Sequence, residues 1–312
     1  MELRILFVGI GSIAKRHIKN LQKIANHEQI KISIDALRRQ KVFDDIIEYN
    51  INNVYNDYSD IKTFYDIIFI TNPTEYHISA LKNVISLSDN FFIEKPIASF
   101  SQIDIAERII LPKNKIYYVA CPLRYNSVIQ YIKNNVKTEE VLYVRSISSS
   151  YLPEWRPNID YRTTYSAHKN LGGGVSIDLI HEWDYLTYLF GIPSQVFYRF
   201  GKISNLEIDT EDFAEYIANY GNKIVSLHLD YYGRYTIREI MLITNEDTII
   251  GDIANNKIHY LKSNKTFNFN EERDDYQIRE LRHFLNIIIH KKNNDNDFYH
   301  AIQTLKLTQG VL

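Results

Sequence analysis

The hydrophobic positions in the first third of the chain alternate between short apolar runs and helical spacing. Strands are predicted at residues 5–8, 30–34, 67–70, 91–93 and 116–120, where apolar residues are continuous or alternate. Helices are predicted over residues 13–25, 43–49 and 75–87 and from Ser101, where apolar residues recur every three or four positions. Such alternation of strand and helix is typical of a parallel sheet with helices on both faces.

The pattern changes after about Pro122, where strands begin to follow one another directly. Strands are predicted at residues 141–150, 196–198, 213–220, 224–232, 238–244 and 247–253, and helices over 276–290 and 298–308. Consecutive strands with helices at the ends indicate an α+β domain. The sequence therefore predicts an α/β domain over residues 1–122 and an α+β domain over residues 123–312.

Composition and charge narrow the possible partners. The 312 residues carry a net charge of −2, which gives no reason to expect nucleic acid or an anionic membrane as a partner. Cys121 is the single cysteine, so an intrachain disulfide and a cysteine-based zinc cluster are both excluded. No apolar stretch reaches the roughly 20 residues that cross a bilayer. We expect a cytoplasmic protein with no membrane partner and no metal site.

A glycine motif follows the first predicted strand and opens the first predicted helix. It reads Gly9-Ile10-Gly11-Ser12-Ile13-Ala14, which is G-x-G-x-x-A, the dinucleotide fingerprint with alanine in third place. Gly9 permits a tight turn, Gly11 lets a pyrophosphate approach the backbone, and Ala14 keeps helix and strand close. The N-terminus of the helix offers N–H groups to the phosphates. The motif predicts an NAD or NADP site.

The end of the second strand bears on the choice between the two cofactors. Asp35 lies near the distance at which an acidic residue binds the ribose of NAD, but the strand continues through Leu37. Arg38 and Arg39 then occupy the strand end, where arginines favour the 2′-phosphate of NADP. We lean towards NADP. The alternative that both arginines are solvated loop charges stays open.

A second glycine run precedes a possible acid/base pair. Residues Gly172–Gly174 lead into a predicted helix that carries Asp178 and His181, three residues apart and so on one helix face. A carboxylate and an imidazole on one face form a candidate acid/base pair, and the glycines allow close approach of a substrate.

Two further segments complete a family resemblance. Residues 70–77 read Ile-Thr-Asn-Pro-Thr-Glu-Tyr-His, and residues 92–97 read Phe-Ile-Glu-Lys-Pro-Ile. With the two glycine segments, these resemble the Gfo/Idh/MocA family of sugar and polyol oxidoreductases, with its T-x-P-x-x-x-H-like loop, E-K-P motif and G-G-G…D…H segment. All four motifs occur in the family's order and cover both predicted domains. The resemblance implies a Rossmann domain followed by a domain built on an open, mostly antiparallel sheet.

The resemblance also implies roles for residues at the motif positions. Lys95 would lie at the nicotinamide and bind the reacting oxygen, His181 would be the general acid/base, and Asp178 its partner or a substrate ligand. The chemistry agrees, because hydride removal from an alcohol needs a proton acceptor, and a cation stabilises the developing alkoxide. Arg124 would line the site at the domain junction. The cofactor loop would comprise Thr71, Asn72, Pro73, His77, Glu94 and Pro96, the last in a cis bond. Structural alternatives remain for the three catalytic candidates: a surface lysine, a core histidine and a helix-capping carboxylate.

The loop of residues 151–165 supplies candidate substrate ligands. Trp155 offers a sugar-stacking face, and Arg156 and Arg162 offer forked donors for a carboxylate or phosphate. We predict an NAD(P)-dependent oxidoreductase acting on a secondary alcohol or ketone of a sugar derivative, with a nucleotide-sugar or nonulosonic acid of bacterial surface-glycan synthesis as the specific hypothesis. A packing or subunit-contact role for the loop remains the alternative.

Other functional classes and the assembly stay open at this stage. A redox-neutral sugar epimerase or eliminase with tightly held cofactor, or a non-catalytic dinucleotide or sugar sensor, would use the same fold. The alternating apolar residues of 224–229 suit helix packing or a subunit interface, and we expect a homodimer or homotetramer. The identity of the sugar and the direction of reaction do not follow from the sequence.

Overall fold

The computed structural model describes residues 2–38 and 43–312, with the side chains of residues 43–45 outside this description. The chain forms two compact units. The first comprises Met1–Ala120 and Gln277–Ile302, and the second comprises Cys121–Tyr276 and Gln303–Leu312. The change of unit near residue 121 lies close to the expected boundary. Assigning all of residues 123–312 to the second domain needs correction, because residues 277–302 pack with the first unit.

The first unit is built on a six-stranded sheet in which every paired strand is parallel. The order is β3-β2-β1-β4-β5-β6, and the strands are β1 (Glu2–Val8), β2 (Lys31–Leu37), β3 (Ile51–Tyr55), β4 (Ile67–Ile70), β5 (Asn90–Ile93) and β6 (Ile116–Val119). The chain order reverses between β1 and β4. In sheets of this type ligands bind at the carboxyl ends of the strands beside such a reversal.

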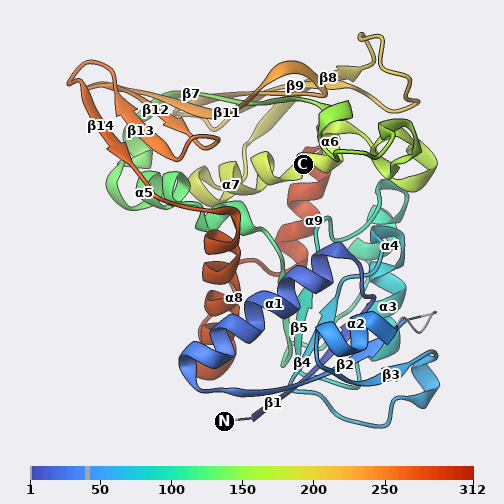
Figure 1. The fold of residues 1–312 in the computed structure, drawn as a ribbon. Helices are drawn as coiled ribbons and strands as arrows, with labels where there is room; N and C mark the ends of the chain where they lie inside the picture. Colours follow the sequence, from blue (N-terminus) through green and yellow to red (C-terminus); the bar gives the residue numbers. More distant parts are fainter. Residues whose placement is uncertain (1, 39–42) are drawn as a thin grey trace. The chain divides into compact units, whose positions relative to one another are not determined.

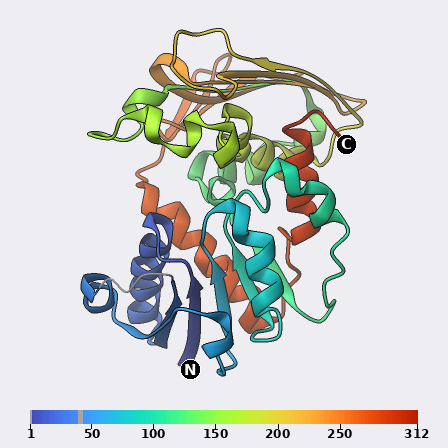
Figure 2. The same ribbon diagram turned by 90° about the vertical axis from the view of Figure 1, so that its right-hand side faces the viewer.

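Helices cover both faces of this sheet. The helices of this unit are α1 (Ser12–Glu28), α2 (Phe43–Glu48), α3 (His77–Val84), α4 (Ile103–Glu107), most of α8 (Arg273–His290) and the first part of α9 (Phe298–Leu307). Helices α1 and α8 lie on one face, and α3 and α4 lie on the other (Figures 1 and 2). The predicted parallel sheet with two covered faces is confirmed.

An aromatic row explains why α8 belongs to the first unit. Phe7, Phe69 and Phe92 come from the neighbouring strands β1, β4 and β5, with ring centroids 4.6 and 4.8 Å apart. Phe284 of α8 packs edge-on against Phe92 at 5.2 Å, and Tyr118 of β6 lies 5.5 Å from Phe284. Because large aromatic side chains gain most from burial, this contact holds α8 on the sheet.

The second unit is built on an eight-stranded sheet in the order β14-β13-β12-β11-β7-β10-β9-β8. The strands are β7 (Val141–Tyr151), β8 (Gln195–Gly201), β9 (Phe213–Asn219), β10 (Ile224–Asp230), β11 (Tyr232–Thr244), β12 (Thr248–Asp252), β13 (Lys257–Tyr260) and β14 (Lys265–Asn268). Neighbours are antiparallel apart from the parallel pair β7–β10. This confirms the expected mostly antiparallel sheet.

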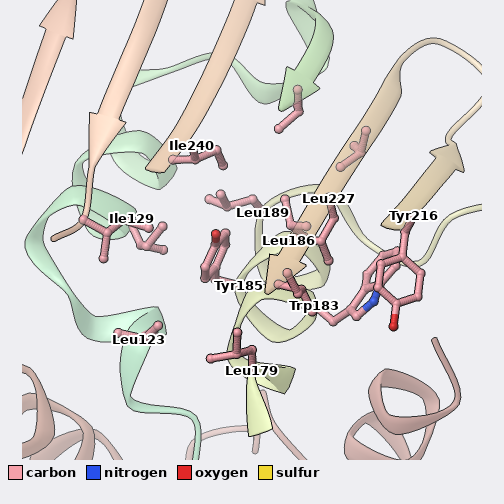
Figure 3. Close-up of a cluster of buried hydrophobic side chains, with 14 of the residues drawn as sticks. Leu123, Ile129, Leu179, Trp183, Tyr185, Leu186, Leu189, Tyr216, Leu227 and Ile240 are labelled. Carbon is pink, nitrogen blue, oxygen red and sulfur yellow. The ribbon is translucent and has the colours of Figure 1, made fainter. Parts of the chain in front are cut away.

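Helices α5 (Ser127–Asn135), α6 (Val175–Asp178) and α7 (Ile180–Phe190) lie against one face of this sheet (Figure 1). Trp183, Leu186 and Leu189 of α7 join Leu227 of β10 and Ile240 of β11 in the core (Figure 3). The alternation in β10 therefore reflects helix packing, because its buried residues face this core. Its other positions turn to the opposite face of the sheet.

Candidate active site

The glycine turn after β1 is shaped by a close approach from the loop after β4. Gly9 has a φ of 90°, and a Cβ built on it would lie 2.8 Å from the backbone of Asn72. Any side chain at this position would therefore force the two loops apart. The Thr71 hydroxyl donates to the Gly9 carbonyl at 2.8 Å, which fastens the turn to β4.

The start of α1 fits a phosphate group. Gly11 is the N-cap of this 17-residue helix and provides no side-chain cap for its first N–H groups. A Cβ built on Gly11 meets no atom within 4 Å, so its backbone faces open space. Uncapped N–H groups and the helix dipole attract phosphate. The residues present therefore fit the pyrophosphate of a dinucleotide.

His77 fastens the loop after β4 to the loop after β5. Its Nδ1 lies 2.9 Å from the Pro96 carbonyl oxygen and its Nε2 lies 2.8 Å from the Asn72 carbonyl oxygen. Burial lowers the pKa of His77, against the effect of these two carbonyls. Sequence analysis placed His77 among the residues lining the cofactor. The structure shows it buried between the two loops, where it sets their spacing.

The E-K-P segment follows β5. The Lys95–Pro96 bond is cis, as expected, and Lys95 is half-buried. The Glu94 carboxylate is buried against His17 of α1, with 2.5 Å between Oε1 and Nε2. Burial alone would raise the pKa of Glu94, but the hydrogen bond from His17 and the nearby charges outweigh it and hold the pKa below its usual value. Glu94 is thus engaged inside the unit.

The end of β2 distinguishes the two residues weighed for the ribose. Asp35 is buried within β2 and accepts hydrogen bonds from Asn53 and from the Tyr65 hydroxyl, the latter at 2.7 Å. Its carboxylate is therefore engaged in packing β2 against β3. Arg38 is the first residue after β2, and its backbone N–H donates to the Tyr55 carbonyl oxygen at 3.0 Å. Arg39 lies outside the described residues.

The second glycine run leads into a broken helix. Asp178 ends α6 and His181 is the second residue of α7, with Leu179 between them at φ −97° and ψ 29°. The prediction of one continuous helix is wrong, because Leu179 leaves the helical region. Gly173 is required by close packing, because a Cβ would lie 2.1 Å from the Tyr165 carbonyl oxygen, and Gly174 has a φ of 133°, which other residues rarely adopt.

Asp178 lies among tyrosines that the sequence analysis did not single out. The Tyr231 hydroxyl donates to Asp178 Oδ2 at 2.6 Å. Tyr165 is 43% exposed and also hydrogen-bonds Asp178; partial burial and this carboxylate raise the pKa of Tyr165. Burial and Asp178 likewise raise the pKa of Tyr231, so both phenols stay protonated and can donate. Tyr231 follows a long strand and Tyr165 lies in a loop, so neither has a local sequence signal.

Glu211 is a second carboxyl group at the same place. It accepts from the Ser176 hydroxyl at 2.7 Å, which fixes the start of α6. Burial raises the pKa of Glu211, and the Asp178 charge adds to the shift. Asp178 is buried and His181 is half-buried, one turn further along the chain. The second unit therefore brings Asp178, Glu211, Tyr165 and Tyr231 together.

The substrate candidates of the loop have different environments. Trp155 donates to the Ser150 hydroxyl and packs edge-on against Tyr231 at 5.2 Å. The Arg156 guanidinium lies over the Tyr165 ring at 5.3 Å. Arg162 is instead engaged by two carboxylates, with Asp160 at 2.8 Å and Glu207 at 3.3 Å. Arg156 thus lies one aromatic ring away from Asp178.

Arg124 lies in the interior of the second unit. Its Nε and Nη2 donate to the two oxygens of Asp184 at 2.8 and 2.6 Å, and its guanidinium lies 5.2 Å from the Tyr188 ring centroid. Both side chains of the ion pair are buried. This ion pair gives Arg124 a packing role inside the second unit, and the site-lining role that the sequence analysis expected stays a prediction.

Comparison with known proteins bears on both units. The family model described as "Oxidoreductase family, NAD-binding Rossmann fold" matches residues 3–120. A curated relative, "Uncharacterized oxidoreductase YrbE" from Bacillus subtilis (strain 168), is 28% identical over 189 residues, which are 59% of this chain and 52% of the relative. The matched part thus spans about half the length of that relative.

Solved structures share the whole fold at low sequence identity. UDP-N-acetylglucosamine 3-dehydrogenase from Acidithiobacillus ferrooxidans has a TM-score of 0.77 at 16% identity, covering 100% of this chain and 97% of that one. Myo-inositol 2-dehydrogenase from Lactobacillus plantarum has a TM-score of 0.77 at 18% identity, covering 99% and 96%. A levoglucosan dehydrogenase complexed with NADH has a TM-score of 0.84 at 14% identity, covering 100% and 96%.

The glycine turn, the loop after β4 and the E-K-P segment are joined at one edge of the first unit, which we call the motif edge. The fold and this motif edge define a two-unit protein with an NAD-binding Rossmann domain. Residues 3–120 thus match the model of the Gfo/Idh/MocA family of oxidoreductases, and the whole chain shares its fold with the solved dehydrogenases. In the part of the chain that the structure describes, no helix is both long enough and apolar enough to span a membrane.

Proposed function

We propose that this protein transfers a hydride between a nicotinamide cofactor and a secondary alcohol or ketone of a sugar derivative. The observation that carries the proposal is the hydrogen-bonded edge of the first unit. Thr71, His77 and Glu94 join the glycine turn, the loop after β4 and the E-K-P segment around the start of α1. A dinucleotide bound there supplies the hydride acceptor or donor.

Three side chains would perform the remaining chemistry. Lys95 would bind the reacting oxygen and stabilise negative charge that develops on it. His181 would take the proton from the alcohol, or return it to the ketone, because an imidazole titrates in the working range of pH. Asp178 would accept a hydrogen bond from a substrate hydroxyl, with Tyr165 and Tyr231 fixing the carboxylate.

For the cofactor we propose a preference for NADP. Arg38 directly follows β2, where a ribose is recognised in folds of this type, and Asp35 is engaged by Asn53 and Tyr65. An arginine at this position suits a 2′-phosphate and a free carboxylate would suit the NAD ribose. Binding constants of the two nucleotides test this. Arg38→Ala should weaken NADP binding about tenfold and leave NAD binding unchanged.

For the substrate we propose a sugar carrying an acidic group, such as a nucleotide-sugar or a nonulosonic acid. The Arg156 guanidinium lies over the Tyr165 ring, whereas the Arg162 guanidinium is paired with two carboxylates. A substrate carboxylate or phosphate could therefore bind Arg156 without displacing a carboxylate, whereas binding to Arg162 would displace one. Because Tyr165 links Arg156 to Asp178, the acidic group would lie about one ring's width from the hydroxyl that Asp178 binds.

The test is a steady-state assay with NAD and NADP against anionic and neutral sugars, namely UDP-N-acetylglucosamine, glucuronate, glucose and myo-inositol. We expect Lys95→Met and His181→Asn to abolish the change in nicotinamide absorbance. Arg156→Ala should raise KM for the anionic sugars about tenfold or more, and Arg162→Ala is the matched control. Substrate conversion without net absorbance change would instead support a redox-neutral epimerase or eliminase. Unchanged turnover in the Lys95 and His181 variants would refute the proposed roles.

We also propose that the protein assembles as a homodimer or homotetramer through the free face of the eight-stranded sheet. Phe197, Ile217 and Ile224 on neighbouring strands are 59%, 52% and 39% exposed and turn away from the helices. Exposed apolar residues in a row are typical of interfaces. Light scattering of the wild type and of Ile217→Asp decides this, since a monomeric wild type would refute it.

A further inference from the structure

Glu94 connects α1 to the backbone of Lys95. One carboxylate oxygen, Oε1, lies 2.5 Å from His17 Nε2, and the other, Oε2, accepts the Lys95 backbone N–H at 3.3 Å. The buried carboxylate therefore contacts a helix on one side and the candidate catalytic residue on the other. The proposed chemistry uses neither Glu94 nor His17.

The His17 ring is held in place by its surroundings. It packs edge-on against Phe92 at 5.1 Å and lies tilted against Phe69 at 5.9 Å, and it is almost fully buried. Among the described residues, its Nδ1 has no hydrogen-bond partner. The polar role of the ring is thus confined to Nε2, which donates to Glu94.

The charge state of Glu94 depends on this donor. The titratable groups that face it are His17 from α1, His77 from α3 and Lys95 beside it. Burial opposes ionisation, and the hydrogen bond from His17 is the largest effect that favours it. Without that bond, the carboxyl group would be buried with one oxygen unsatisfied, and its pKa would rise.

We propose that His17 is a positioning residue for Lys95, acting by holding Glu94 as an oriented carboxylate against the Lys95 backbone. The proposal rests on the proposed function of Lys95. His17 touches neither substrate nor cofactor in this role. A role in packing alone is the competing explanation, and the two differ in their dependence on pH.

The experiment compares His17→Leu, His17→Gln and Glu94→Gln, with Ile24→Val as a control for loss of packing on the buried face of the same helix. Glutamine can place a donor where His17 Nε2 lies, whereas leucine fills space without donating. We expect His17→Leu to lower kcat about tenfold and to move the acid limb of the kcat profile to higher pH. His17→Gln should restore both, and Ile24→Val should change neither.

An infrared titration of the protein without cofactor gives a readout independent of turnover. The band of the protonated Glu94 carboxyl, assigned by its absence in Glu94→Gln, should appear at higher pH in His17→Leu than in the wild type. The inference is overturned if this midpoint does not move, or if His17→Leu lowers kcat with an unchanged pH profile. Failure of the proposed function would look different, because Lys95→Met would then retain turnover while the infrared shift remained.

Discussion

Polar side chains are held differently at the motif edge of the first unit and in the loop of residues 151–165 of the second unit. At the motif edge, Thr71, His77 and Glu94 are each bonded to a partner from another loop or helix. In the loop, Tyr165 is 43% exposed and Arg156 lies on its ring. Under the proposed function, the cofactor would meet the fixed contacts of the motif edge, and the sugar would meet loop contacts that can be replaced.

The largest expected effect comes from removing the ammonium group of Lys95 at the motif edge. Lys95→Met should reduce turnover by about 10³ or more, because under the proposed function it removes the cation that stabilises the reacting oxygen. Dinucleotide affinity, measured by fluorescence titration, should stay within about twofold, since the glycine turn does not depend on the ammonium group. A similar loss of dinucleotide affinity would show that Lys95 also helps to bind the cofactor, and the effect on turnover could then not be assigned to chemistry alone.

A strong effect is also expected inside the second unit, away from its exposed loop. Arg124→Met leaves Asp184 buried without its partner, and breaking a buried ion pair by removing one member costs about 3 kcal/mol or more. Urea denaturation measures the loss. The double variant Arg124→Met/Asp184→Leu should recover part of it. An unchanged free energy of unfolding in Arg124→Met would mean that the buried ion pair can be replaced as readily as the contacts of the exposed loop of residues 151–165.

Gly9→Ala tests the motif edge where the glycine turn and the loop after β4 approach each other most closely. The left-handed φ and the approach of Asn72 both oppose a side chain, so we expect a loss of about 2 kcal/mol and much weaker dinucleotide binding. Thermal unfolding and nucleotide titration report the two effects. Gly11→Ala, at a position with open space, should reduce binding with little effect on stability.

The tyrosines at Asp178 allow the two types of contact to be compared within one unit. Tyr231→Phe removes a buried hydrogen bond to a carboxylate and should lower stability by about 1.5 kcal/mol. Tyr165→Phe removes a partly exposed one and should change stability less, with its effect appearing in KM. Equal destabilisation by both variants would contradict the division into fixed and replaceable contacts.

The smallest effect is a pH dependence on the free face of the second sheet. His228 lies between Asp230, at 2.8 Å, and Glu215, and these hydrogen bonds raise the pKa of His228 above 6.5, with Asp230 as the larger cause. Its stabilisation is therefore complete below pH 6.5 and is lost as pH rises through the higher folded-state value. The stability difference between wild type and His228→Asn should shrink across this range, and a constant difference would rule out the ion pairs.

The sequence predicted the elements whose apolar pattern is local and strong. Most strands of the parallel sheet and the long strand over residues 141–150 were found, and the mostly antiparallel second sheet follows from them. The elements β3, β13, β14 and α5 had no prediction. The strands among them are short, and a segment such as Ile-Asn-Asn-Val-Tyr carries too few apolar positions to show a period. The place of α8 depends on Phe284 meeting Phe92, a contact invisible to any local pattern.

The candidate site divides in the same way. Gly9 and Lys95 became candidates because the sequence motifs around them are recognisable. Tyr165, Tyr231 and Glu211 were missed, since they reach Asp178 and Ser176 only through folding. The motif that contains Arg124 was visible in the sequence, but its ion-pair partner Asp184 lies 60 residues away and could not be foreseen. Spacing shows which residue types are available, and long-range packing decides which of them are engaged.

The return of residues Gln277–Ile302 to the first unit has a consequence for biosynthesis. The ribosome synthesises β1 to β6 long before Phe284. The aromatic row of the parallel sheet is therefore not covered by α8 during this time. During that interval Phe69 and Phe92 are open to chaperones and to other nascent chains. The first unit is therefore completed only after the strands of the second unit have been made.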